Sequence, residues 1–193
     1  MGPQTLRDAP RVLHTPRLTL EAPRVEHAQG FAAVLNASLD GWRFIGWGQV
    51  ARDLAWAEQF CRHGAQLVDD GEGLIFNVFD HAGGGCVGRI DLHSFDFDAP
   101  RCEIGYVGDS RLSGQGLMRE AVLAVVELGF GIGLARIEAF SDVRNHRAIH
   151  FARGLGFVTE GVVHARERDP QGALCDQVLM ARLRPAELPP ASG

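Results

Sequence analysis

The chain has 193 residues, 46% of them hydrophobic and 22% charged, as expected for a globular protein of one domain or at most two. Its formal net charge of −5 argues against a general surface for nucleic acid or acidic membranes. No apolar run approaches the roughly 20 residues of a membrane span. The four cysteines are widely spaced and no signal peptide is recognisable, so we expect reduced thiols in a cytoplasmic protein.

The first part of the chain predicts one strand, two helices and a loop. Val12–Glu21 is the strand, interrupted at Thr15–Arg17. Apolar residues recur at helical spacing in Val25–Leu39 and in Ala51–Leu67. Between these helices the loop Asp40–Gly48 is rich in glycine and holds three large aromatic residues. Those aromatics serve either as packing anchors or as the lid of an acceptor pocket.

The middle of the chain predicts three strands in succession, followed by a helix. The strands are Gly73–Asp80, Cys86–Phe95 and Arg101–Val107, which are joined by turn-forming residues. Leu117–Phe130 is the helix. Short connections between consecutive strands predict antiparallel pairing.

The last part predicts a strand at Ile137–Ser141, a helix at Arg147–Leu155 and a closing hairpin of Val158–Ala165 with Leu174–Leu183. The hairpins favour an α+β fold over a doubly wound parallel one. We therefore predict three layers: a mixed, mostly antiparallel sheet of six to seven strands with about four helices on its faces.

The predicted domain organisation is simple. Residues 1–10 are polar and contain proline, so we expect a flexible arm. Residues 11–183 form a single domain. Residues 184–193 are expected to be a disordered tail, since they are rich in proline.

A turn with two glycines, in Arg111–Met118, connects a predicted strand to a predicted helix. Such a turn is an anion site, because free backbone N–H groups and the positive end of the helix dipole face it. The dinucleotide fingerprint requires a third glycine where this chain has Arg119, and the P-loop requires a lysine, which the sequence lacks. On this octet alone, an ordinary glycine turn remains an alternative.

The octet fits the pattern Arg/Gln-x-x-Gly-x-Gly/Ala and resembles the pyrophosphate loop of the GCN5-related N-acetyltransferase (GNAT) family. A second segment, Asn145–Phe157, resembles the family's Asn-x-x-Ala/Ser element, in which a helix flanks the pantetheine arm and ends in Gly-Phe. Thr15–Leu20 is similar to the opening strand of the ribosomal-protein (RimJ/RimL-like) branch. The resemblance covers nearly the whole chain.

The resemblance implies direct transfer of an acetyl group from acetyl-CoA to an amine, with coenzyme A as product. The coenzyme would bind where the strands Cys102–Val107 and Ile137–Ser141 diverge, and the N–H groups of Leu112–Leu117 would hold its pyrophosphate. Arg111 and Arg119 would add positive charge or be ordinary surface residues. The residues assigned to cofactor binding are Tyr106, Val107, Arg111, Leu112, Ser113, Gly114, Gln115, Gly116, Leu117, Met118, Asn145 and Phe151. Asn145 would bond near the pantetheine or cap the following helix.

An ammonium group must lose its proton before it can attack the thioester. If Phe95 pairs with Arg101, then His93 lies opposite Glu103, with Asp91 on the same face. The family often has a glutamate base at the Glu103 position, so we predict Glu103 as the base and His93 as the second candidate. A solvated sheet face is the alternative.

The general acid is left open. Many family members have a tyrosine at the position of Phe151, and some use a serine near Ala148; this chain has neither. The thiolate leaving group has an ordinary pKa near 8.5 and does not require an acid. His146 and His150 lie four residues apart, but no further ligands are near in sequence, so we expect no metal site.

The favoured function is acetylation of the α-amine at a protein N-terminus, since the acidic residues around Glu103 suit a cationic acceptor. One alternative is a small amine, such as an amino acid, a polyamine or an antibiotic. Another is a non-catalytic acyl-CoA-binding protein. We expect no direct contact with nucleic acid or membrane; a homodimer is a family-level expectation.

Overall fold

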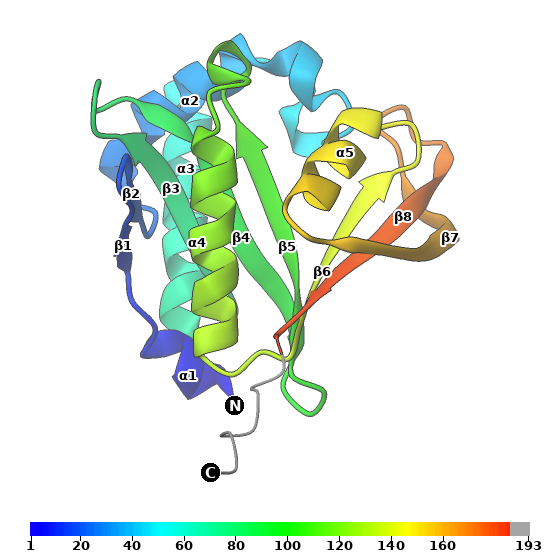
Figure 1. Cartoon of the computed structure of the whole chain (residues 1–193). Coiled ribbons are helices and arrows are strands. Elements are labelled where there is room, and N and C mark those ends of the chain that lie inside the picture. Colours follow the sequence, from blue (N-terminus) through cyan, green and yellow to red (C-terminus); the bar gives the residue numbers. More distant parts are fainter. Residues whose placement is uncertain (186–193) are drawn as a thin grey trace.

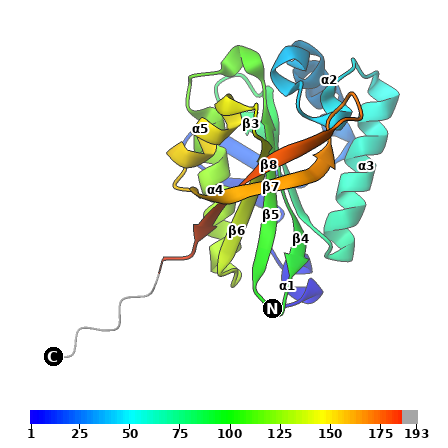
Figure 2. The same ribbon diagram turned by 90° about the vertical axis from the view of Figure 1, so that its right-hand side faces the viewer.

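A computed structural model of the chain describes residues 1–185. Eight strands form one sheet in the order β1-β2-β3-β4-β5-β6-β8-β7, with helices on both faces (Figures 1 and 2). The strands are β1 (Val12–His14), β2 (Leu18–Glu21), β3 (Leu74–Asp80), β4 (Cys86–Asp96), β5 (Arg101–Gly108), β6 (Arg136–Asp142), β7 (Val158–Arg168) and β8 (Leu174–Leu183). The α-helices are α1 (Pro3–Arg7), α2 (Ala28–Ala37), α3 (Leu54–Asp70), α4 (Leu117–Gly131) and α5 (His146–Gly154). Short 3-10 helices are η1 (Val25–His27), η2 (Leu39–Trp42), η3 (Gly46–Gly48) and η4 (Ser110–Leu112).

The predicted fold class is confirmed. All strand pairs are antiparallel except β5 with β6. Figure 2 shows three layers, with α4 and α5 on one face of the sheet and α2 and α3 on the other. The sheet has one strand more than the upper predicted number, and the described residues contain five α-helices where about four were predicted.

The extra strand comes from the interruption at Thr15–Arg17, which turns the chain back on itself. Val12 pairs with Glu21 and His14 with Thr19, so the single predicted strand is a hairpin of β1 and β2. Thr15 bonds to the backbone of Leu18 across the turn. Glu120 of α4 accepts hydrogen bonds from Thr15 Oγ1 and from the backbone N–H of Arg17, which ties the turn to the helix layer.

The predicted N-terminal arm is corrected by the structure. Residues Pro3–Arg7 form α1, and Leu6 and Ala9 are buried. Leu6 and Ala9 join the main core, and Arg7 Nη1 donates to the carbonyl of Asp70 in α3, so the segment is held against the domain by several contacts. The predicted tail, 184–193, lies outside the described residues except for Arg184 and Pro185.

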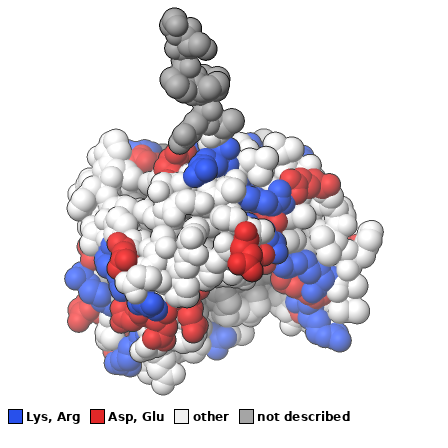
Figure 3. All heavy atoms as spheres, turned by 90° about the horizontal axis from the view of Figure 1, so that it is seen from below, with Lys and Arg blue, Asp and Glu red and all other residues white. Residues whose placement is uncertain are grey.

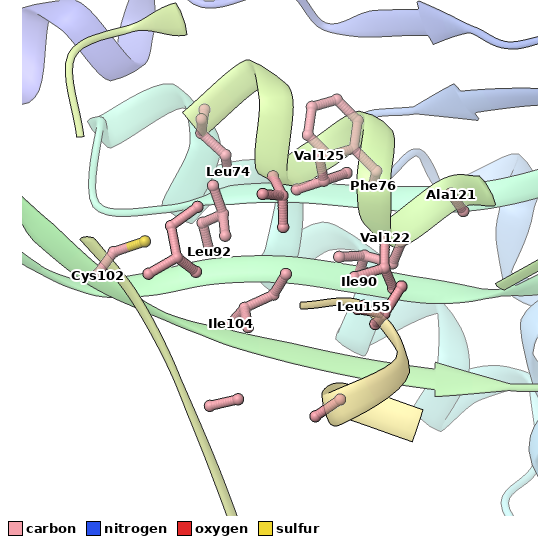
Figure 4. Close-up of a cluster of buried hydrophobic side chains, with 14 of the residues drawn as sticks. Leu74, Phe76, Ile90, Leu92, Cys102, Ile104, Ala121, Val122, Val125 and Leu155 are labelled. Carbon is pink, nitrogen blue, oxygen red and sulfur yellow. The ribbon is translucent and has the colours of Figure 1, made fainter. Parts of the chain in front are cut away.

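The core lies mainly between α4 and the sheet. Ala121, Val122 and Val125 of α4 point onto the central strands, where they meet Phe76 and Ile90 (Figure 4). All five side chains are at most 1% exposed. Met118, at the N-terminal end of α4, lies against Gly88 of β4 and Gly108 of β5, where an added Cβ would be 2.9 Å and 2.6 Å from its side chain.

The parallel pair of β5 and β6 is short. Register runs only from Arg101↔Arg136 to Glu103↔Glu138, although β5 continues to Gly108 and β6 to Asp142. Beyond Glu103 the two strands separate, and α5 follows β6 on the same side as α4 (Figure 1). The predicted divergence of these strands is therefore present, and it opens the sheet at its centre.

The end of the molecule that carries α1 and the β4–β5 hairpin has acidic and basic side chains interspersed (Figure 3). This mixture fits the small net charge of −5. In the described part of the chain, no helix combines the length and apolarity needed to cross a membrane.

Candidate active site

Two cavities meet where β5 and β6 separate. The turn cavity, of about 320 Å³, lies over the start of α4 and the turn before it. The strand cavity, of about 390 Å³, lies over β4, β5 and β6. Both volumes are in the range of ligand sites, which is about 300–1,000 Å³. The residues that line both cavities are Ile45, Tyr106, Val107, Asn145 and Ala148.

The turn cavity has the features of an anion site. Gly114 and Gly116 have φ of +84° and +75°, the left-handed region that favours glycine. Gly116 caps α4 without a side-chain hydrogen bond, so the first N–H groups of the helix have no intrahelical acceptor. These groups, beginning at Leu117, face a cavity at the positive end of the helix dipole.

The free amides are not the full set that the sequence predicted. The N–H groups of Leu112, Ser113 and Gln115 bond to backbone carbonyls within the turn. The bonds from Leu112 and Ser113 form the tight 3-10 turn η4, so these N–H groups are not available to a ligand. Gly114, Gly116 and Leu117 remain from the predicted run, and the next amides of α4, those of Met118 and Arg119, join them.

Most predicted cofactor residues line the turn cavity. They are Tyr106, Val107, Leu112, Ser113, Gly114, Gly116, Leu117, Met118, Asn145 and Phe151. Arg111 and Gln115 are not among the lining residues. The carbonyl of Gln115 accepts a hydrogen bond from Arg17 Nη1, which draws it toward the β1–β2 turn.

Arg111 is occupied by a carboxylate. Its Nη2 lies 2.5 Å from Asp109 Oδ2, and its Nε also bonds to the carboxylate of Asp109. These bonds from Arg111 hold the pKa of Asp109 below its ordinary value. Asp109 lines the turn cavity and is buried, so Arg111 neutralises a negative charge that would otherwise face the anion site.

Two other arginines line the turn cavity. Arg147 Nη2 bonds to Ser113 Oγ at 2.6 Å, and Arg119 Nη1 bonds to the carbonyl of Gly154. Arg147 was not predicted, because a helix surface arginine carries no signal of its own. Its position directly after Asn145 and His146, at the start of α5, brings it to the glycine turn.

Asn145 connects the two cavities and also caps α5. Its Oδ1 accepts from the N–H of Ala148 at 3.2 Å, as one of its two predicted roles required. That bond uses the carbonyl oxygen and leaves the side-chain NH2 group as a donor. The rings of Tyr106 and Phe151 pack with centroids 5.3 Å apart, and burial raises the pKa of Tyr106, so its hydroxyl stays protonated.

The strand cavity collects the predicted polar residues. His93 lies opposite Glu103 and Asp91 opposite Gly105, as predicted, and all four line the cavity. His93 Nε2 is 3.5 Å from Asp91 Oδ2. Because Gly105 has no Cβ, the carboxylate of Asp91 can lie over it; a Cβ there would be 2.9 Å from Asp91 Oδ2.

One detail of the predicted register is wrong. Asp96, not Phe95, pairs with Arg101, and the register shifts between His93 and Asp96. Ser94 has a φ of +54° at this bulge. The extra residue lies after His93, so the pairing of His93 with Glu103 is unaffected.

Glu103 has a partner that the sequence did not reveal. Arg166 Nη2 lies 3.1 Å from Glu103 Oε1, and the guanidinium stacks 3.5 Å above the ring of Phe140. Arg166 lies on β7, where the register with β8 shifts between Val163 and Glu167. A bulge of this kind re-aims side chains and is not readable from alternation.

In the aromatic loop Asp40–Gly48, one residue is a packing anchor and others line a cavity. Trp42 is an anchor, with 4% of its surface exposed and its Nε1 donating to the carbonyl of Gly108 at 3.1 Å. Phe44, Ile45 and Trp47 line the strand cavity. The loop therefore forms a wall of that cavity and is fixed to the end of β5.

In the described residues, no three His, Cys, Asp or Glu side chains lie together as a metal site. The four cysteines are unpaired thiols, and burial raises the pKa of Cys86 to about 12. None of the four cysteines lines either cavity.

A family model described as "Acetyltransferase (GNAT) domain" matches residues 17–158. Comparison of the sequence with curated proteins finds no match. Among solved structures, the microcin C7 self-immunity acetyltransferase MccE, in complex with acetyl-CoA and AMP, aligns with a TM-score of 0.81 and 18% identity, covering 88% of this chain and 94% of that one.

Two further solved structures have titles that name ribosomal proteins. RimL, a ribosomal L7/L12 α-N-protein acetyltransferase in complex with coenzyme A, aligns with a TM-score of 0.80 and 19% identity, covering 89% of this chain and 97% of that one. The ribosomal-protein-S5-alanine acetyltransferase from Vibrio fischeri aligns with a TM-score of 0.76 and 20% identity, covering 92% and 99%. At these sequence identities, the similarity to the three solved structures shows a shared fold and nothing more specific.

Proposed function

The chain belongs to the GNAT acetyltransferase family, whose domains use acetyl-CoA, and from this premise we propose that it acetylates the α-amine at the N-terminus of a protein. The observation that carries the proposal is the meeting of the two cavities at the divergence of β5 and β6. One cavity offers an anion site for the diphosphate and the other offers carboxylates for an ammonium. The thioester belongs at their junction.

In the turn cavity, the amides at the start of α4 would bind the diphosphate. Arg147 and Arg119 line the same cavity and would add two positive charges. Asn145 would hold the pantetheine arm through its side-chain NH2 group, since Oδ1 already caps α5.

At the junction, β5 offers the donors that polarise a thioester. Beyond Glu103 the edge of β5 that faces β6 has no strand partner, so alternate backbone groups along it are free. The N–H group of Tyr106 would then bind the acetyl oxygen as it gains negative charge, because the neighbouring N–H of Val107 faces β4. Amides that are already oriented stabilise an oxyanion without reorganising.

In the strand cavity, Glu103 would accept the proton of the ammonium, directly or through a water molecule. The free amine attacks the acetyl carbon, an N–C bond forms and the C–S bond breaks. The electron pair of that bond would leave with the sulfur, and the second proton, which the nitrogen loses as it becomes an amide, would neutralise the coenzyme A thiolate. Asp91 and His93 would hold the cationic acceptor beside Glu103.

Three observations support a peptide acceptor. Asp91, Glu103 and Glu167 line the strand cavity, which suits an α-ammonium. Its volume of about 390 Å³ is that of the first one or two residues of a peptide and not of a folded chain. RimL and the S5-alanine enzyme, named as acetyltransferases of ribosomal proteins, share the fold.

The test is thiol release from acetyl-CoA with three sets of acceptors: short peptides with free N-termini, the same peptides with blocked N-termini, and small amines including polyamines. We expect thiol release only with free N-termini, matched by a gain of one acetyl group on the peptide. Preference for small amines would assign the alternative acceptor class. Binding of acetyl-CoA with background thiol release throughout would contradict an enzymatic role.

A further inference from the structure

Arg89 is a buried cation in the wall of the strand cavity. It lies on β4, two residues before Asp91 and on the same face of the sheet. Only 6% of its surface is exposed, and within the described residues its side chain makes neither a hydrogen bond nor an ion pair. Its Nη1 is buried without any partner.

Aromatic packing fixes the guanidinium without satisfying it. The guanidinium carbon lies 4.3 Å from the centroid of the Phe60 ring and 5.9 Å from that of Phe31. Gly64 of α3 lets it approach the helix, since a Cβ there would be 2.8 Å from Arg89 Nη2. Cation–π contacts stabilise a guanidinium by less than its burial without a hydrogen-bond partner destabilises it. The buried guanidinium therefore lacks an acceptor.

The position of Arg89 relative to the reaction is set by the sheet. In the β4–β5 register Arg89 lies opposite Val107, one of the residues that line both cavities. Asp91 lies on the same face, about 7 Å further along β4. If the amine of an acceptor lies near Asp91 and Val107, a group a few bonds from that amine can therefore reach Arg89.

Resting on the proposed function, we propose that Arg89 binds a carboxylate of the acceptor, so that the substrate is an amine with a carboxylate within a few bonds of its nitrogen. The carboxylate has two possible sources. One is an acidic side chain at the N-terminal residue of a peptide, which agrees with the proposed function. The other is the α-carboxylate of a free amino acid, which would assign the acceptor to the small-amine alternative. In both cases the cavity binds opposite charges at once, the ammonium at Asp91 and Glu103 and the carboxylate at Arg89.

A purely structural role would use water. Asn77 lies opposite Arg89 in the β3–β4 register, and its Oδ1 is also buried without a partner. A water molecule between the two would satisfy one atom of each. In that case Arg89 would affect stability but would not distinguish a charged acceptor from a neutral one.

The experiment compares acceptors that differ only in a negative charge: alanine with alaninamide, and Asp-Ala-Ala-amide with Asn-Ala-Ala-amide. For at least one pair we expect kcat/KM to be tenfold or more higher for the charged member. Arg89→Gln should remove this preference by slowing the charged member alone. Arg89→Lys, which keeps the charge, should retain part of it. The pair that responds identifies the source of the carboxylate.

A binding measurement separates this inference from the proposed function. Calorimetry with the CoA-saturated protein compares N-acetylalanine with its amide, and N-acetyl-Asp-Ala-Ala-amide with its Asn counterpart. Tighter binding of an acid, lost in Arg89→Gln, supports the inference even if no thiol is released. The inference is overturned if the wild type binds acid and amide equally. It is also overturned if Arg89→Gln loses the same affinity for both. Unchanged acetyl-CoA affinity shows that a variant is folded. If Arg89→Gln does not fold, the comparison of acid with amide in the wild-type protein decides the question by itself.

Discussion

In the proposed mechanism Glu103 is the base, and its surroundings suit that role. It faces the cavity from β5 and shares that cavity with Asp91 and His93, while Arg166 bonds to one of its oxygens. The second oxygen is left for the acceptor. Arg166 itself is held by stacking on Phe140, so the carboxylate has a fixed orientation.

We expect Glu103→Gln to lower kcat/KM by about 10²–10³-fold, because proton transfer by a positioned base contributes about 10²–10⁴-fold. The affinity for acetyl-CoA should stay unchanged, since Glu103 lines the strand cavity and not the turn cavity. Glu167→Gln is a matched control: Glu167 lines the same cavity and also pairs with Arg166. Equal losses in the two variants would remove Glu103 from the role of base.

Arg111 offers a second prediction at the residue scale. If it acts by neutralising Asp109, Arg111→Ala should weaken acetyl-CoA binding by about tenfold, because a buried carboxylate is left unpaired beside the diphosphate. The double variant Arg111→Ala/Asp109→Asn should recover most of that affinity, measured by calorimetry. Failure of the double variant to recover would mean that Arg111 contacts the coenzyme directly.

Sequence reasoning found the residues that pair across neighbouring strands and missed those that arrive from elsewhere. The hairpin between β4 and β5 was enough to place His93 opposite Glu103. Arg166 comes from a bulge in another hairpin and Arg147 from the surface of α5. Arg89 is not among the predicted site residues, because its burial depends on packing by α2 and α3, which no local pattern reveals.

At the scale of elements, the turn before α4 is the part of the site that was most predictable. Two glycines between a strand and a helix specify a backbone conformation, and the structure has both in the left-handed region. Element ends were harder to predict. The β1–β2 hairpin and the helix α1 depend on single contacts, those of Glu120 and Leu6, whose partners are distant in sequence.

Gly116→Ala tests the turn. An alanine at φ of +75° is strained by about 1 kcal/mol, and we expect acetyl-CoA binding to weaken tenfold or more as the first amides of α4 shift. Gly84→Ala is the control, because Gly84 has a φ of +62° in the β3–β4 connection and open space around its Cβ. It should lose similar thermal stability and bind acetyl-CoA normally. Unchanged affinity in Gly116→Ala would contradict the anion site.

At the scale of the whole molecule, the layer of α2 and α3 on the sheet depends on a buried histidine. His27 lies before α2, is 6% exposed and bonds to Asn77 of β3. Burial, followed by the nearby charge of Arg24, lowers the pKa of His27 below its ordinary 6.5. The folded protein therefore keeps His27 neutral at a pH where the unfolded chain binds a proton.

Stability should accordingly be complete above pH 6.5 and fall as the pH is lowered from 6.5 through the depressed pKa of folded His27. The free energy of unfolding in urea, measured between pH 7.5 and 5, gives this slope. His27→Gln should flatten it in the same window. A slope that is unchanged in the variant would assign the pH dependence to other groups.

The whole-molecule claim is that one coenzyme spans both cavities, and a crystal structure of the protein with coenzyme A tests it most directly. We expect the diphosphate to lie within hydrogen-bond distance of the N–H groups of Leu117 and Met118. We expect the thiol to lie between the separated ends of β5 and β6, facing Glu103. A coenzyme bound elsewhere, or one whose pantetheine arm passes outside the two strands, would contradict it.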